Sequence, residues 1–190
     1  MPDAPPAAPG PVLGGARRIL VYGVTGSGKS TLARQLSDLT GIGWTDVDHE
    51  CWRPGWVQVP APEQRRFFED VCARPAWLLD TAYGTWRDVP LARADLVVAL
   101  DYPRWVSLAR LVRRTTGRVV LRRRACHGNL ESLGRTVGQD SILRWHVRSF
   151  DRKRARIREM AADPLGPPVV RLSSPRETAR WLARQRERLG

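Results

Sequence analysis

The segment GVTGSGKS, residues 23–30, constrains more than any other feature what this chain can fold into. It follows a short apolar, β-prone run over 17–23. After it comes a stretch, 29–41, whose apolar residues recur at helical spacing before a terminal glycine. The pattern G-x-x-x-x-G-K-[ST] in this position is typical of a phosphate-binding loop. The sequence therefore predicts a strand, the loop and a helix as the first unit of an α/β domain.

The residue types in this loop indicate which ligand it takes. Successive backbone N–H groups form a nest for an anion, and the following helix N-terminus adds partial positive charge. We expect Lys29 to reach the β- and γ-phosphates and Ser30 to ligate Mg²⁺, so the predicted ligands are ATP, or a close relative, and magnesium. The residues expected to contact the nucleotide are Gly23, Thr25, Gly26, Ser27, Gly28, Lys29, Ser30, Thr31 and, from a later segment, Arg110.

The rest of the chain alternates between strand and helix patterns. Further strands are predicted near 42–48, 76–80, 95–101 and 168–172, and helices near 62–74, 104–114, 140–160 and 175–189. The last helix is signalled by Ser174 and Glu177, which form an S-x-x-E capping box around a proline. This alternation predicts a three-layer α/β fold, with a parallel sheet of about five strands and helices on both faces.

Length and composition indicate one soluble domain. The chain has 190 residues; residues 1–16 read as a disordered Pro/Ala-rich tail, and 17–190 as the domain. No apolar run is long enough to cross a bilayer, so no membrane partner is expected. Three cysteines without C-x-x-C spacing favour a reducing compartment, the cytoplasm. We expect a monomer or weak dimer.

The basic charge of the chain is local. The net charge is +13, and residues 104–158 hold sixteen basic and three acidic side chains, which leaves the remainder neutral. Arginines bind phosphate oxygens bidentately and stay charged, which suits stabilisation of a transferring phosphoryl group. Arg114 and Arg118 are the catalytic candidates from this segment. The alternative is that the basic segment forms a face that binds nucleic acid, although the sequence contains no motif typical of base recognition.

Three sets of carboxylates follow predicted strands and could complete a magnesium site: Asp46 with Asp48, Asp80, and Asp101. On a strand, Asp46 and Asp48 would point to one face at the carboxyl end of the sheet. They could then hold a magnesium-bound water and an acceptor hydroxyl. Alternatively, Asp46 caps the next turn. Trp52, in the loop that follows, could stack on a base, wall off the acceptor or pack locally.

Several segments together resemble the P-loop kinases of the adenylate-kinase (nucleoside monophosphate kinase) type, and most of all the bacterial DNA topology modulation, or FlaR-like, proteins. They are the phosphate loop, DVDHECWRPGW (46–56), WLLDTAYGTWRD (77–88), RADLVVALDYPR (93–104), RLVRRTTGR (110–118), GNLESL and DSILRW. The resemblance covers about residues 18–185. It implies an acceptor-binding insert over 45–75, an arginine-bearing lid over 114–136, and Asp80 as the carboxylate that holds magnesium with Ser30.

The acceptor side departs from the adenylate-kinase pattern. Such proteins have D-G-F-P-R, with an arginine that touches an acceptor phosphate, where this chain has DTAYGTWR. Arg87 could take the place of that arginine, but its spacing from the aspartate is different. The pair Asp46 and Asp48 looks more like the hydroxyl-binding carboxylates of shikimate- and gluconate-type kinases, which would make Asp48 the general base. The acceptor could be a nucleotide or a small hydroxylated molecule. The acceptor-side candidates are Asp46, Asp48, Trp52 and Arg87.

Two functions follow from these patterns. The first is an ATP-dependent phosphotransferase in which Lys29, Asp48, Arg114 and Arg118 are catalytic and Ser30 with Asp80 holds Mg²⁺. The second is a nucleotide-dependent protein that binds DNA or RNA through the basic segment, with ATP as a switch. Because the lid already gives the basic charge a use, the first is favoured.

Overall fold

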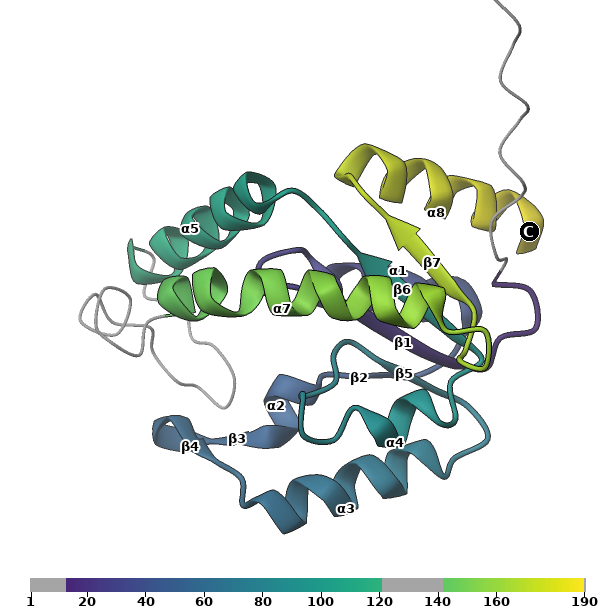
Figure 1. Ribbon diagram of the computed structural model, residues 1–190, viewed down its shortest axis with the longest axis horizontal. Coiled ribbons are helices and arrows are strands. Elements are labelled where there is room, and N and C mark those ends of the chain that lie inside the picture. Colours follow the sequence, from purple (N-terminus) through teal and green to yellow (C-terminus); the bar gives the residue numbers. More distant parts are fainter. Residues whose placement is uncertain (1–12, 121–141, 190) are drawn as a thin grey trace, which may run out of the picture.

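Five strands form one sheet in which every neighbouring pair is parallel. The computed structural model describes residues 13–120 and 142–189, without the side chains of 118–120 (Figure 1). The sheet strands are β1 (Arg18–Gly23), β2 (Trp44–Thr45), β5 (Trp77–Leu79), β6 (Leu96–Leu100) and β7 (Val169–Leu172). A hairpin of β3 (Trp52–Arg53) and β4 (Val57–Gln58) is joined by the 3₁₀ turn Pro54–Trp56. The helices are α1 (Lys29–Thr40), α2 (Val47–Cys51), α3 (Ala61–Cys72), α4 (Asp88–Leu91), α5 (Arg104–Val120), α7 (Ile142–Ala162) and α8 (Pro175–Leu189).

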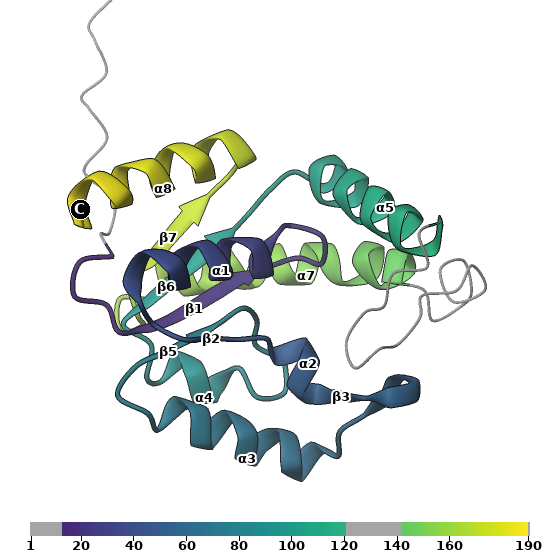
Figure 2. The same ribbon diagram turned by 180° about the vertical axis from the view of Figure 1, so that it is seen from behind.

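The central strand β1 is buried on both faces, as its continuous apolar run predicts. Ile19 and Val21 face one layer of helices, and Leu20 and Tyr22 face the other, because successive side chains of a strand alternate. α7 crosses one face of the sheet in Figure 1, and α1 crosses the opposite face in Figure 2. The three-layer α/β fold expected from the sequence is confirmed.

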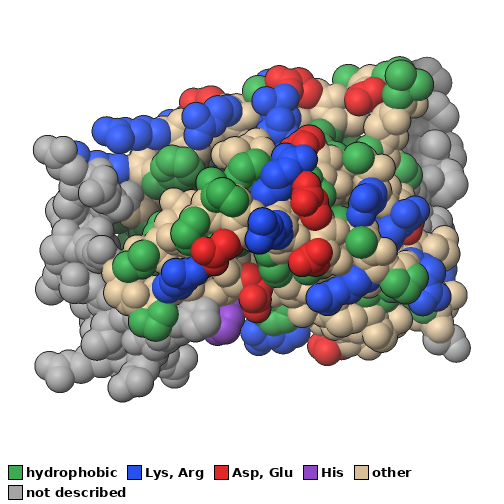
Figure 3. Space-filling model, turned by 90° about the horizontal axis from the view of Figure 1, so that it is seen from below, with side chains coloured by type: hydrophobic (Ala, Val, Ile, Leu, Met, Phe, Trp, Pro, Cys, Tyr) green, Lys and Arg blue, Asp and Glu red, His purple; other side chains and the backbone are tan. Residues whose placement is uncertain are grey.

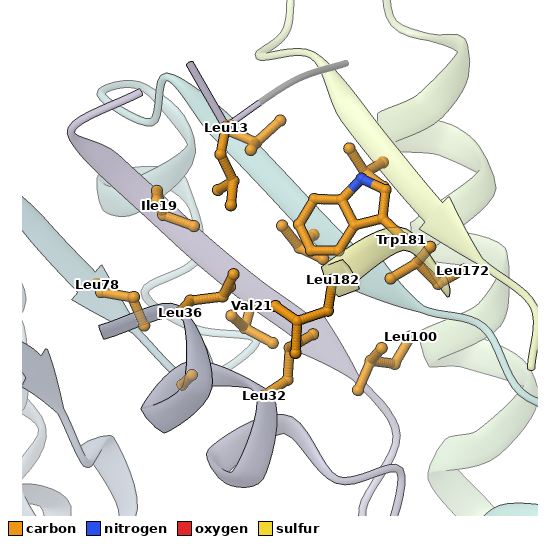
Figure 4. Packing of buried hydrophobic residues seen from close by; sticks show 14 of the residues in the cluster. Leu13, Ile19, Val21, Leu32, Leu36, Leu78, Leu100, Leu172, Trp181 and Leu182 are labelled. Carbon is orange, nitrogen blue, oxygen red and sulfur yellow. The ribbon is translucent and has the colours of Figure 1, made fainter. Parts of the chain in front are cut away.

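Two hydrophobic clusters hold these layers together. The cluster in Figure 4 joins α1 and α8 to the sheet through the labelled residues Leu13, Ile19, Val21, Leu32, Leu36, Leu78, Leu100, Leu172, Trp181 and Leu182. The second cluster joins α2, α3 and α7 to the opposite face, with Val47, Phe68 and Ile157 fully buried. Leu13 is 2% exposed, and its N–H donates to Gln185 Oε1 at 3.0 Å. The domain therefore includes Leu13, whereas the sequence predicts a tail to residue 16.

The strand order is β2-β5-β1-β6-β7. The chain runs from β1 to β2 and β5 on one side, and then crosses β1 to add β6 and β7 on the other. This reversal places a topological switch point at the carboxyl end of β1, where ligands of open α/β sheets bind. The loop 23–30 lies at that point, so the fold puts the predicted phosphate loop where a ligand is expected.

Some boundaries differ from those predicted. The strand predicted over 42–48 is only Trp44–Thr45, because α2 begins at Val47. α5 continues to Val120 instead of ending near 114, since no proline interrupts it and Gly117 is tolerated inside the helix. Residues 45–75, the expected insert, hold α2, the β3–β4 hairpin and α3. Most of the expected lid, 114–136, lies outside the described residues.

The capping box of α8 is shifted by one residue on one side. The Ser174 hydroxyl accepts the Glu177 N–H at 3.1 Å, as predicted, but Glu177 Oε2 accepts the N–H of Ser173 at 2.7 Å.

Within the described part of the chain, no helix has both the length and the apolar character to span a bilayer.

Candidate functional site

The phosphate loop depends on two glycines in the left-handed region, Gly26 at φ 80° and Gly28 at φ 99°. At Gly26 there is also no room for a side chain. A Cβ atom there would lie 2.5 Å from the carbonyl oxygen of Ser107 and 2.9 Å from the Cβ of Leu111, both on α5. The loop backbone is therefore packed directly against α5, which fixes its curvature from outside.

Short hydrogen bonds stabilise the turn from inside. The buried Ser27 donates from its N–H and its hydroxyl to the carbonyl oxygen of Val24, at 3.2 and 2.8 Å. Gly23 closes β1, Thr25 is half-buried, and Thr31 is exposed in the first turn of α1. These residues stand in the conformation that the loop pattern predicts, at the N-terminus of a twelve-residue helix.

Lys29 is half-buried and its ammonium donates to the carbonyl oxygen of Val24 at 3.2 Å. Burial lowers its pKa, and the nearby Arg114 lowers it further, while Asp48 and Asp80 raise it. Lys29 thus lies within reach of the charges of Asp48, Asp80 and Arg114, three of the candidates that the sequence named. An ammonium held in this way gains from an anion placed beside it.

The Ser30 hydroxyl donates to Asp80 Oδ2 at 2.5 Å, and Asp80 Oδ1 accepts the N–H of Val47 at 3.1 Å. Asp80 is 3% exposed, and burial raises its pKa to about 6 despite the hydrogen bond from Ser30. A buried carboxylate and a hydroxyl are hard oxygen ligands of the kind that Mg²⁺ uses together with substrate phosphates. The described residues contain no cluster of three His, Cys, Asp or Glu side chains. Ser30 and Asp80 thus supply two oxygen donors of the type that magnesium takes.

Asp101, the third carboxylate considered, has another use. Its side chain is fully buried, and it accepts hydrogen bonds from Arg154 Nε at 2.6 Å and Arg171 Nε at 2.7 Å. These bonds tie the end of β6 to α7 and to β7. Asp101 is neutralised by two guanidinium groups, so it is a structural anchor and not a magnesium ligand.

The expectation that Asp46 and Asp48 lie on one strand and point to one face is wrong. Asp46 is the N-cap of α2, and its side chain accepts the N–H of His49 at 3.1 Å. Asp48 is the second residue of that helix. Capping satisfies a backbone donor that a helix leaves free, and this local gain ends the strand at Thr45, three residues early. The capping alternative thus describes Asp46, and the charges of Asp46 and Asp48 both act on Asp80.

Asp48 is held by a side chain that the sequence analysis missed. The Tyr83 hydroxyl donates to Asp48 Oδ1 at 2.8 Å and accepts from Trp52 Nε1 at 3.0 Å. Burial and the Asp48 charge raise the pKa of Tyr83, so it stays a donor to the carboxylate. Trp52 also packs edge-on against Trp56, with ring centroids 6.1 Å apart. Trp52 therefore orients Asp48 through Tyr83, in addition to its packing in the loop.

Arg87 lies beside the hydroxyl of Tyr22, the buried residue that precedes the phosphate loop. Burial raises the pKa of Tyr22, and the nearby guanidinium groups of Arg87, Arg156 and Arg152 lower it. These groups come from the start of α4 and from α7. The charges of several cations therefore act on Tyr22, and of these only Arg87 was predicted as a site residue.

On the donor side, Arg110 reaches from α5 to the loop. Its Nη1 donates to the Ser27 carbonyl oxygen at 3.0 Å, and its guanidinium carbon lies 5.6 Å from the centroid of the Tyr102 ring. Arg114 is exposed near Lys29. The side chain of Arg118 lies outside the described part, as do Arg122, Arg123, Arg124 and Arg135.

Solved structures of small-molecule kinases have the same architecture. A shikimate kinase from Acinetobacter baumannii in complex with shikimate is 19% identical, with a TM-score of 0.55 over 93% of this chain and 94% of that one. A shikimate kinase from Bacteroides thetaiotaomicron is 15% identical, with a TM-score of 0.54 over 92% and 98%. A gluconokinase from Sinorhizobium meliloti 1021 is 18% identical, with a TM-score of 0.51 over 91% and 95%. The chain has the fold of the P-loop kinases. No protein-family model matches the sequence, and no curated protein is significantly similar to it.

Proposed function

We propose that this protein is an ATP-dependent kinase that transfers the γ-phosphoryl group to a hydroxyl group of a small, negatively charged acceptor. The observation that carries the proposal is the hydrogen bond from Ser30 to the buried Asp80 beneath the loop that holds Lys29. Hydroxyl, carboxylate and ammonium are the three side-chain groups that P-loop phosphotransferases use on the donor side. The likeness to shikimate kinases and a gluconokinase supports this choice of reaction through the fold.

The donor side binds and orients the triphosphate. The backbone N–H groups of 25–30 surround the phosphates, Lys29 contacts the β- and γ-phosphates, and Arg110 clamps the loop from α5. Ser30 and Asp80 would hold magnesium, which would supply positive charge to the triphosphate. Arg114 and, from α5, Arg118 are proposed to stabilise the charge that builds up on the transferring group.

Asp48 is proposed to orient the acceptor and receive its proton. The acceptor oxygen forms a bond to the γ-phosphorus while the bond from that phosphorus to the bridging oxygen breaks, and ADP leaves. The proton of the acceptor hydroxyl passes to the Asp48 carboxylate. Tyr83 holds one oxygen of Asp48 at 2.8 Å, which leaves the other oxygen for the acceptor.

Basic side chains near Tyr22, on the face of the sheet that α2 also covers, support an anionic acceptor. The charges of Arg87, Arg152 and Arg156 all act on Tyr22, and one of them, Arg156, is paired with Glu159 at 2.6 Å. A carboxylate or phosphate of the acceptor, bound bidentately by Arg87, would offset the remaining charge. The class therefore includes hydroxy acids, sugar phosphates and nucleoside monophosphates, and a neutral polyol is disfavoured.

A coupled assay of ADP release tests the proposal. Wild type and Lys29→Ala are compared on a panel of hydroxy acids, sugar phosphates, nucleoside monophosphates and neutral polyols. We expect at least one anionic acceptor to stimulate release, with Lys29→Ala inactive and Arg87→Ala showing a raised KM for that acceptor. Absence of stimulation by every compound would refute the kinase reading. Stimulation by neutral polyols alone would refute the anionic acceptor.

The second candidate is a nucleotide-dependent protein that binds nucleic acid, of the DNA topology modulation type that the sequence resembles. It is favoured by the sixteen basic residues of 104–158 and by two aromatic side chains there, Trp105 and Trp145, which are 73% and 49% exposed. On the face shown in Figure 3, by contrast, basic and acidic side chains are interspersed. A mobility shift of duplex and single-stranded DNA at physiological salt, with a steep salt dependence, would favour this candidate over the kinase.

A further inference from the structure

The two lysines of this chain stand apart from its thirty arginines. Among 32 basic residues, only Lys29 and Lys153 are lysines. The rest of the basic surface is built from arginine, so these positions are the exceptions. A lysine ammonium is a compact charge with rotatable donors, whereas the arginine guanidinium is a planar fork. Since Lys29 belongs to the phosphate loop, the position of Lys153 is of interest.

Lys153 lies on the inner face of α7. The buried residues of this helix follow one stripe: His146, Ser149, Phe150, Ile157 and Met160. Lys153 is three residues after Phe150 and four before Ile157, so its side chain leaves the helix on the same stripe. Its neighbours point elsewhere, because Arg154 binds Asp101 and Arg152 lies over the ring of Trp145. Lys153 is therefore the charged member of an otherwise buried face.

The contacts of α7 show what this stripe faces. Near its start, His146 Nε2 is 2.8 Å from the hydroxyl of Ser107, the residue whose carbonyl packs against Gly26 of the phosphate loop. Further along, Ile157 packs in the cluster that contains Tyr22 and Val47. Lys153 lies between these two contacts. Along α7, it thus stands between the contact with α5, the helix that packs on the phosphate loop, and the contact with the cluster that contains Val47 of α2, the helix of Asp48.

The charges around Lys153 come from both sides of the proposed reaction. Burial, together with the charges of Lys29 and Arg152, lowers its pKa to about 7, although Asp48 raises it. Among the described residues it has no carboxylate within salt-bridge distance. A half-buried ammonium without a paired anion is unfavourable in the free protein, and a bound anion would relieve that cost.

We propose that Lys153 is a second active-site lysine, which binds an oxygen of the γ-phosphoryl group of ATP from α7 while Lys29 binds it from α1. The assignment rests on the proposed function, since it takes Mg-ATP to be bound at the phosphate loop. The charges of Lys29 and Asp48 both act on Lys153, and the group that passes between donor and acceptor is the γ-phosphoryl. A point charge with rotatable donors can stay in contact as that group moves, which a rigid fork does less well.

Nucleotide binding tests the assignment without knowledge of the acceptor. Calorimetry with the magnesium complexes of ADP and of a non-hydrolysable ATP analogue compares wild type, Lys153→Met and Arg158→Met. Arg158 is exposed on the same helix, so it controls for the loss of one positive charge. Lys153→Met is expected to weaken binding of the ATP analogue about tenfold, which corresponds to the loss of one charged hydrogen bond, and to leave ADP binding unchanged. Arg158→Met should change neither.

Equal weakening of both nucleotides by Lys153→Met, or no weakening of either, would overturn the assignment. Binding of neither nucleotide by wild type would instead refute the proposed function on which it rests. If Lys153→Met does not fold, NMR of the wild-type protein after reductive ¹³C-methylation provides the test. Only the two lysines and the amino terminus are labelled, so the signal of each lysine can be followed. The Lys153 signal, identified by its loss in Lys153→Arg, should shift with the ATP analogue and not with ADP. The same shift with both would contradict the proposal.

Discussion

The Ser30 hydroxyl donates a hydrogen bond to Asp80 Oδ2 over 2.5 Å, although fifty residues separate the two in sequence. β1 and β5 are parallel neighbours, so the loop after one and the residue after the other meet at the same edge of the sheet. This pair joins the phosphate loop to a buried carboxylate. It is the structural basis for the proposed magnesium site.

If Ser30 and Asp80 act as one unit, their effects on Mg-ATP binding should not multiply. We expect Ser30→Ala and Asp80→Asn each to weaken Mg-ATP roughly 10- to 100-fold, as loss of a metal-supporting group does. The double variant should be little worse than the weaker-binding single variant. Calorimetry with magnesium, and again with EDTA, provides the measurement, and the differences should shrink in EDTA. Fully multiplicative losses would show that the two residues act independently.

Asp101→Asn should affect folding and not the magnesium site. It removes the charge that holds Arg154 and Arg171, and we expect the free energy of unfolding to fall by about 2–4 kcal/mol. Asp151→Asn is the control, because Asp151 also pairs with an arginine but is 82% exposed. That change should cost less than about 1 kcal/mol. Denaturant titration measures both. A loss of Mg-ATP affinity in folded Asp101→Asn would place this carboxylate in the site after all.

Gly26→Ala should disturb the packing between the phosphate loop and α5. The new Cβ would meet the Ser107 carbonyl oxygen at 2.5 Å, in a backbone conformation that already disfavours alanine. Gly41→Ala is the matched control, because Gly41 has φ 71° and nothing within 4 Å of an added Cβ. Gly41→Ala should lower the free energy of unfolding by about 1–2 kcal/mol through backbone strain alone. Gly26→Ala should lower it distinctly more and should also weaken nucleotide binding. Equal melting temperatures of Gly26→Ala and Gly41→Ala would contradict the close contact between Gly26 and α5.

The buried His146 should make stability depend on pH. Burial lowers its pKa from the ordinary 6.5, and Arg104 and Lys153 lower it further, so the folded protein keeps it neutral. As the pH falls below 6.5, the unfolded chain takes up a proton that the folded one does not. The free energy of unfolding should then fall by up to about 1.4 kcal/mol per pH unit. His146→Gln should reduce this slope between pH 6.5 and 5.5, whereas His49→Gln, on an exposed histidine, should not. An unchanged slope in His146→Gln would contradict a neutral His146.

The donor side of the site could be predicted because its signals are local. The glycine spacing of 23–30, with a strand before it and a helix after it, specifies the loop and its residues. The parallel strands then follow from alternating apolar runs. The family resemblance predicted Asp80 as the carboxylate that holds magnesium with Ser30, and the hydrogen bond between the two side chains agrees with that prediction.

The acceptor side could not be predicted to the same depth because its contacts join distant segments. Tyr83 holds Asp48 from 35 residues away, and no local pattern indicates that bond. Asp46 was misplaced because an aspartate after a short apolar run suits both a strand end and a helix cap, and tertiary packing decides between them. For Lys153 a signal existed: it interrupts the buried stripe of α7 and is one of only two lysines.

Calorimetric titration of Mg-ATP into wild type and Lys29→Met tests most directly whether this chain is a P-loop nucleotide-binding protein. We predict one site per chain in wild type, with a dissociation constant in the micromolar range, on the order of the values that enzymes of this kind show for their substrates. Lys29→Met should bind at least about tenfold more weakly, because it loses a charged contact to the phosphates. No binding by wild type at millimolar Mg-ATP, or equal binding by the two proteins, would contradict the account.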